Sequence, residues 1–196
     1  MGCQYSNQIR ELEKRLERTC PFCQHPRPKS VEEGHKNIMK RIEANDPVAI
    51  CHLGSRRQQE GDYKSAFEYW SKAAELGDVD AHYKLSILYS NGLGVGKDEK
   101  KKFYYAEEAA IGGHPLARHN LGCAEEGKDR AVKHWIIAAN LGNDMSMEIL
   151  KKGFKKGMVS KEDFAAALRA HQAAVDATKS PQREKGEAAK QRWRWR

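Results

Sequence analysis

Two short patterns recur three times in the middle of this 196-residue chain, and they restrict its fold more than any other feature. The first pattern is alanine, three variable residues, leucine, and then glycine or serine, at Ala49–Gly54, Ala81–Ser86 and Ala117–Gly122. These copies begin 32 and 36 residues apart. Because self-similarity with a period in the thirties is typical of stacked helical repeats, the pattern predicts a solenoid.

A second pattern follows each copy of the first. It is complete at Ala66–Gly77 and Ala131–Gly142, as alanine, tryptophan four residues later, an Ala-Ala pair and a final glycine, and it is weaker at Tyr105–Gly113. The spacing of both patterns places their apolar residues on one face of a helix. Each repeat is therefore predicted to be helix, turn, helix, with Gly77 and Gly142 ending helices in the left-handed conformation.

The loop between the two helices of the second repeat is rich in glycine, with the sequence Gly92-Leu-Gly94-Val-Gly96-Lys-Asp98. Together with Ala81-x3-Leu85-x3-Tyr89 before it, and with Lys-Ala-Ala-Glu-Leu-Gly at 72–77, this loop resembles the Sel-1-like repeat family, a relative of the tetratricopeptide repeat. The resemblance covers about residues 36–178. It implies an all-α fold, a right-handed helix-turn-helix solenoid of about four Sel-1-like, tetratricopeptide-like repeats.

Both ends of the repeat region carry weaker copies. Lys36–Pro47 matches the second helix of a preceding repeat, whereas Gly122–Ala131 is several residues too short for a full helix and loop. The first helix of that third repeat is thus expected to end early. A start resembling a capping box, Ser160-x2-Asp163, predicts a closing helix over Phe164–Ala177.

The family resemblance implies a binding function, because most members hold other proteins on a curved helical surface. The tetratricopeptide arrangement places one residue of each first helix on the concave side, and another residue one turn later. The predicted partner-binding residues are Cys51, Tyr83 and His119, followed by Ser55, Ile87 and Cys123. The alternative is that these side chains partly pack between repeats. We expect a protein-protein interaction adaptor or scaffold whose partners are other proteins of unknown identity.

The N-terminal residues 1–30 contain a Cys-x2-Cys pair, Cys20 and Cys23, that resembles the final ligand pair of a RING zinc finger. Structural zinc takes four ligands, and the earlier Cys and His that would share this metal in a RING are missing. This argues against ubiquitin-ligase activity and leaves a protein with an incomplete RING as one alternative. Two interpretations remain, a zinc site formed by Cys3, Cys20, Cys23 and His25 or a loop without metal. The expected cofactor is therefore either none or zinc.

The same N-terminus also fits a lipidation signal. Met1-Gly2-Cys3-Gln4-Tyr5-Ser6 matches the Met-Gly-x3-Ser motif for N-myristoylation of Gly2, and Cys3 is placed for palmitoylation. Two acyl groups are enough for stable membrane anchoring, whereas one is marginal. A second alternative is therefore an acylated adaptor tethered to a membrane.

Charge is concentrated at the two ends of the chain. The net charge of +8 divides into +3 for residues 1–30, +5 for residues 179–196, and zero for the 148 residues between them. A neutral body argues against a folded nucleic-acid-binding surface. The tail is predicted to be disordered, and its final Arg192–Arg196 alternates Arg and Trp, which suits a membrane interface, bases or an acidic groove as well as a merely solvated tail.

The chain carries none of the common catalytic motifs. A phosphate-binding loop, a dinucleotide fingerprint, His-Glu-x2-His and Gly-x-Ser-x-Gly are all missing, so no enzyme activity is expected. Five cysteines without an export signal, and no apolar run near 18 residues, indicate a cytoplasmic protein that contacts a membrane only if it is acylated or through its Arg/Trp tail. The expected domains are a Cys-x2-Cys segment (1–30), the solenoid (31–178) and the tail (179–196).

Overall fold

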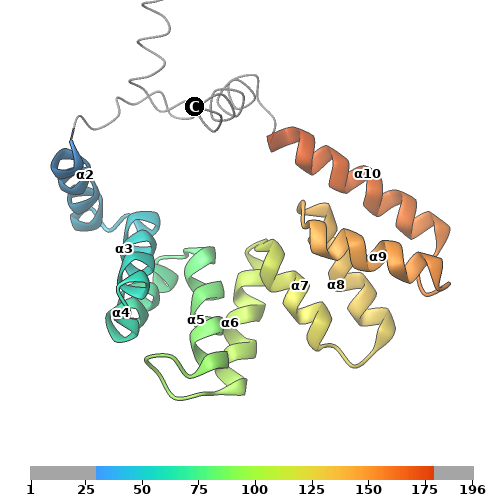
Figure 1. The fold of residues 1–196 in the computed structure, drawn as a ribbon, viewed down its shortest axis with the longest axis horizontal. Helices are drawn as coiled ribbons and strands as arrows, with labels where there is room; N and C mark the ends of the chain where they lie inside the picture. The colour runs from blue at the N-terminus through green and yellow to red at the C-terminus, as the bar shows by residue number, and fades with distance from the viewer. Residues whose placement is uncertain (1–29, 179–196) are drawn as a thin grey trace, which may run out of the picture. The chain divides into compact units, whose positions relative to one another are not determined.

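The computed structural model describes residues 30–178, and all regular structure within that range is helical (Figure 1). The described residues belong to two units, 30–40 in the first and 41–178 in the second. Residues 30–40 form most of one helix. The helices are α2 (Val31–Glu43), α3 (Pro47–Gln59), α4 (Tyr63–Glu75), α5 (Val79–Asn91), α6 (Glu99–Ile111), α7 (Pro115–Ala124), α8 (Lys128–Asn140), α9 (Asp144–Lys155) and α10 (Lys161–Thr178).

Within the second unit, helices pack against their neighbours in sequence. The largest contacts are α3 with α4, α5 with α6, and α7 with α8, and the second helix of each pair then packs on the first helix of the next. The closing helix α10 lies against both α8 and α9. Figure 1 shows α3 to α8 succeeding one another in this order. The predicted all-α solenoid of about four helix pairs is confirmed, with α9 and α10 as the fourth pair.

Most of the described helices start with a side chain that accepts a backbone N–H group of the first turn, whereas α8 starts at Gly127 without such a cap. Asp46, Asp62 and Asp78 cap α3, α4 and α5 at intervals of sixteen residues, and Asp98, His114 and Asn143 cap α6, α7 and α9. The turns between pairs use glycine where the backbone is left-handed. Gly77 and Gly142 have φ of 87° and 85°, which confirms their prediction as helix-ending glycines.

The irregular positions also follow the sequence. Helix α7 has 10 residues, whereas α5, α6 and α8 have 13 each, so the predicted early end of the first helix in the third repeat is confirmed. Before α10, the Ser160 hydroxyl accepts the Asp163 N–H at 3.0 Å and donates to the Asp163 carboxylate at 2.8 Å. The closing helix runs from Lys161 to Thr178 and contains the predicted Phe164–Ala177.

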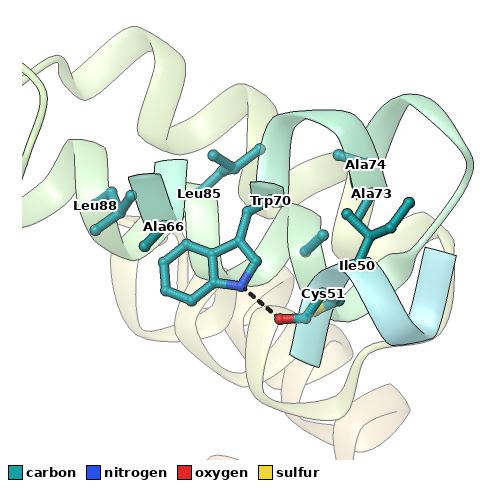
Figure 2. Close-up of a cluster of buried hydrophobic side chains, with 9 residues drawn as sticks. Ile50, Cys51, Ala66, Trp70, Ala73, Ala74, Leu85 and Leu88 are labelled. Carbon is teal, nitrogen blue, oxygen red and sulfur yellow. Dashed lines mark hydrogen bonds between the residues drawn. The ribbon is translucent and has the colours of Figure 1, made fainter. Parts of the chain in front are cut away.

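A tryptophan packed on a glycine joins the two helices of the first repeat. Trp70 on α4 is 1% exposed, and its indole N–H donates to the Cys51 carbonyl at 3.1 Å (Figure 2). A Cβ atom added to Gly54 would lie only 2.6 Å from the indole ring. The third repeat has the same close approach, in which a Cβ on Gly122 would lie 2.8 Å from the Trp135 ring, but Trp135 is only partly buried and its indole N–H makes no hydrogen bond. The glycine of the first pattern and the tryptophan of the second are thus one packing unit.

The second repeat departs from this unit at both positions. Ala106 stands three residues before the Ala-Ala pair, where the other repeats have tryptophan, and Ser86 stands where they have glycine. The weaker copy of the pattern begins at Tyr105, but it is Ala106, one residue later, that occupies the tryptophan position. Tyr105 instead stacks on Tyr89 with ring centroids 5.6 Å apart. This substitution leaves space between α5 and α6.

We predict that Gly54→Ala destabilises the protein by about 1–3 kcal/mol, because the new methyl group collides with a ring that is fully enclosed. The free energy of unfolding in urea measures the change. Gly96→Ala is the matched control, because nothing lies within 4 Å of a Cβ there, and its effect should stay within about 0.5 kcal/mol. Equal stability of the two variants would contradict the packing unit.

Candidate functional site

An open cavity of about 320 Å³ lies between α5, α6 and α7. Its lining is mostly apolar and includes a few polar side chains. The lining residues from α5 and α6 are Tyr83, Ser86, Ile87, Ser90, Lys102, Phe103 and Ala106. The lining residues from α7 are Ala117, Asn120, Leu121, Cys123 and Ala124. A concave, mostly apolar site with a few placed polar groups is typical of a binding pocket.

The cavity arises from the missing tryptophan of the second repeat. Both Ser86 and Ala106, the residues that replace the Gly–Trp unit, are buried and line it. A large-to-small replacement leaves a cavity when the surrounding helices cannot collapse into the space. Ser86 also compensates for the lost indole N–H: its hydroxyl donates to the Tyr83 carbonyl at 2.7 Å. That carbonyl is equivalent to the Cys51 carbonyl that accepts from Trp70.

A second replacement brings a positive charge to the cavity. Lys102 stands at the position of Ala66 and Ala131 in the flanking repeats. Its ammonium group lies 2.9 Å from a Glu99 carboxylate oxygen and 4.8 Å from the centroid of the Phe103 ring. The hydrogen bond from Lys102 lowers the pKa of Glu99. The cavity therefore combines a mostly apolar lining with one lysine.

Three of the six predicted partner-binding residues line this cavity. Tyr83, Ile87 and Cys123 come from α5 and α7 and face the same space. The Tyr83 ring is stacked on His114, with centroids 4.2 Å apart. The Cys123 thiol is exposed, and its sulfur lies 3.6 Å from His119 Nε2. Predicted residues from the second and third repeats therefore line one site.

The other three residues pack between helices or along them. Cys51 is 6% exposed, and the Ser55 hydroxyl donates to the Cys51 carbonyl at 3.1 Å. His119 is 8% exposed, and its Nδ1 lies 2.7 Å from the Ser146 hydroxyl of α9. His119 thus contacts the next helix pair, whereas the hydrogen bond of Ser55 stays within α3. A role of any of the six in binding a partner stays a prediction.

Nine of the twelve residues that line the cavity were not among those predicted from the sequence. Among them, Ser90 and Asn120 belong to the first helices, whereas Lys102 and Phe103 come from the second helix of the repeat. The signal that could have found Lys102 and Ala106 is the register of the Ala-Ala pairs. When Ala109 is aligned with Ala73 and Ala138, Ala106 stands where the other repeats have tryptophan, and Lys102 stands where they have alanine.

The predicted zinc ligands Cys3, Cys20, Cys23 and His25, and the lipidation residues Gly2 and Cys3, lie outside the described residues, so they stay predictions. Within residues 30–178, no three His, Cys, Asp or Glu side chains are grouped closely enough to hold a metal ion. The same stretch contains no helix with the length and apolar character needed to cross a membrane.

Comparison with known proteins identifies the repeats. The sequence model of the Sel1 repeat family matches residues 47–78, 79–114 and 115–143. Residues 47–143 are three Sel1 repeats. Each match covers one helix pair, α3–α4, α5–α6 and α7–α8, and the cavity lies at the boundary between the second and third repeats. Sel1 repeats generally mediate protein–protein interactions.

Solved structures with the same architecture are similar to this chain. A Sel1 repeat protein from Oxalobacter formigenes is 28% identical, with a TM-score of 0.55, over 61% of this chain and 98% of that chain. A protective antigen of uropathogenic Escherichia coli with an SLR fold is 26% identical, with a TM-score of 0.58, over 74% of this chain and 33% of that chain.

Among curated proteins, the chain is similar to DAP3-binding cell death enhancer 1. The rat protein is 30% identical over 76 residues, which are 39% of this chain and 15% of the relative. The mouse protein is 23% identical over 198 residues, which are 79% of this chain and 39% of the relative. The chain thus spans well under half the length of these relatives.

We predict that iodoacetamide at pH 8 alkylates Cys123 at least tenfold faster than Cys51. Cys123 is exposed at the cavity, whereas burial raises the pKa of the Cys51 thiol to about 12, so little thiolate forms there. Peptide-resolved mass spectrometry of the folded protein measures both rates in one sample. Unfolding in urea is the control, and it should bring the two rates together. Equal rates in the folded protein would contradict the described burial.

We also predict that stability falls as the pH drops from 7 to 5. Burial lowers the pKa of His119 in the folded protein below its ordinary value of 6.5, so below that pH the unfolded chain binds the extra proton first. The stabilising contribution is complete above pH 6.5 and is lost on acidification. His119→Gln should flatten the pH dependence of the urea midpoint. His52→Gln, at an exposed position, is the control.

Proposed function

We propose that this chain is an adaptor module that holds another protein against the face formed by α5, α6 and α7. The observation that carries the proposal is the open cavity, which gathers Tyr83, Ile87 and Cys123 from two successive first helices. Three features of this site support binding to a protein. The lining is mostly apolar, it includes hydroxyl, amide and ammonium groups, and the volume suits one or two anchoring side chains.

The relatives support the same class of function. By its name, DAP3-binding cell death enhancer 1 binds the protein DAP3. For the present chain we propose the general property, capture of a protein segment on Sel1 repeats, without assigning DAP3 as the partner. The partner contacts are proposed to extend from the cavity onto exposed residues of α7 such as Asn120.

The proposal is tested with Asn120→Arg, which adds a long charged side chain at the edge of the cavity. Asn120 is exposed, and arginine is a good helix former, so the variant should fold normally. Partners captured by the full chain from its source cells are identified by mass spectrometry, and the affinity of each is then measured with purified proteins. We expect Asn120→Arg to weaken binding at least tenfold.

The matched control is Ala173→Arg, an exposed position on α10 that does not line the cavity. This variant should bind every partner with unchanged affinity. Circular dichroism and the thermal midpoint establish that both variants are folded. Partners that bind wild type and Asn120→Arg equally well would contradict the assignment of this face.

A further inference from the structure

We propose that the cavity between α5, α6 and α7 receives a tryptophan side chain of a partner protein, on a segment with acidic residues beside the tryptophan. This inference rests on the proposed function and specifies the chemistry that the site recognises. It is carried by the comparison of the three Sel1 repeats with one another, because the second repeat differs from the other two at the glycine, tryptophan and alanine positions.

The flanking repeats show what fits between the two helices of a repeat. In the first repeat Trp70 fills this space from within, 1% exposed and pressed on Gly54. In the third repeat Trp135 occupies the equivalent position on Gly122. An indole is therefore the side chain that the paired helices of these repeats accommodate. In the second repeat Ala106 leaves a cavity of about 320 Å³ instead, and because Ser86 replaces the glycine, an incoming indole would lie beside the Ser86 side chain rather than over it.

The polar group inside the cavity suits an incoming indole. The Ser86 hydroxyl donates its proton to the Tyr83 carbonyl at 2.7 Å. A hydroxyl oxygen that donates can still accept a hydrogen bond. The buried Ser86 therefore offers an acceptor to the N–H of a bound tryptophan, in place of the carbonyl that Trp70 uses in its own repeat.

The positive charge of Lys102 favours acidic residues beside the tryptophan of the partner. Lys102 lines the cavity at a position where the flanking repeats have alanine, and α6 begins with Glu99 followed by Lys100, Lys101 and Lys102. The Lys102–Glu99 pair is partly exposed, and such pairs contribute little, so a carboxylate of the partner can replace Glu99. The complementary ligand thus joins an indole to a negative charge.

Another source of tryptophan is this chain itself, at Trp193 and Trp195 in the C-terminal Arg192–Arg196. Those tryptophans are flanked by arginine, which Lys102 and its neighbouring lysines repel. We therefore assign the cavity to an acidic partner segment, and binding of the arginine-flanked sequence becomes an outcome of the test.

The experiment uses the full chain and three synthetic peptides. They are acetyl-Glu-Trp-Glu-amide, acetyl-Glu-Ala-Glu-amide, which lacks the indole, and acetyl-Arg-Trp-Arg-amide, which reverses the charge. Two-dimensional NMR titrations follow the amide signals of α5, α6 and α7. We expect Glu-Trp-Glu to shift signals around Ser86 and Ala106 and to bind at least tenfold more tightly than either other peptide.

The double variant Ser86→Gly/Ala106→Trp restores the Gly–Trp unit of the flanking repeats. We expect it to raise the thermal midpoint, because the indole fills the cavity, and to lose Glu-Trp-Glu binding at least tenfold. Ala173→Trp, which adds an indole at an exposed site on α10, is the control and should bind like wild type. Lys102→Glu tests the charge separately, and it should reverse the preference toward Arg-Trp-Arg.

Several results would overturn the inference. Equal binding of Glu-Trp-Glu and Glu-Ala-Glu to the wild-type chain would show that the cavity is not a tryptophan site, even if the double variant fails to fold. Tighter binding of Arg-Trp-Arg would assign the cavity to the chain's own C-terminal sequence instead. Partner capture that survives the double variant but not Asn120→Arg would overturn the tryptophan site alone. Capture that survives both would overturn the proposed function as well.

Discussion

The close approach of a first-helix glycine to a second-helix tryptophan is the contact on which the rest of this structure depends. Gly54 with Trp70, and Gly122 with Trp135, let a ring lie where a Cβ atom would otherwise collide with it. The contact fixes how near the two helices of a repeat come, and the next pair then stacks on that spacing. Where the second repeat lacks both partners of the contact, the cavity that defines the candidate site lies between α5, α6 and α7.

Much of the fold could be predicted because local rules agree with it. The helix caps, the left-handed Gly77 and Gly142, and the Ser160–Asp163 start each depend on a few neighbouring residues, and a single sequence displays those directly. The short α7 followed from counting residues between two patterns. Each of these features is set within about one turn of helix, so no knowledge of distant contacts was needed.

The candidate site was only half predictable, for a physical reason. The helical period identifies which face a residue lies on, but not whether another helix covers that face. Tyr83 and Cys123 line an open cavity, while His119, at a position equivalent to Tyr83, is covered by Ser146 from α9. The cavity itself depends on a residue that is missing, Trp replaced by Ala106, and this becomes visible only when the repeats are compared in the register of their Ala-Ala pairs.

The uneven distribution of large side chains has a consequence for how the solenoid moves. The first cluster of buried residues contains Trp70, and the last contains Met147 and Leu150, whereas the middle cluster consists of Ala109, Ala110 and Ala117. In a linear array each repeat is held only by its neighbours, so the interface with least buried apolar surface opens most readily. We therefore expect the boundary between the second and third repeats to open before the others, and a side chain bound there would add apolar contacts across it.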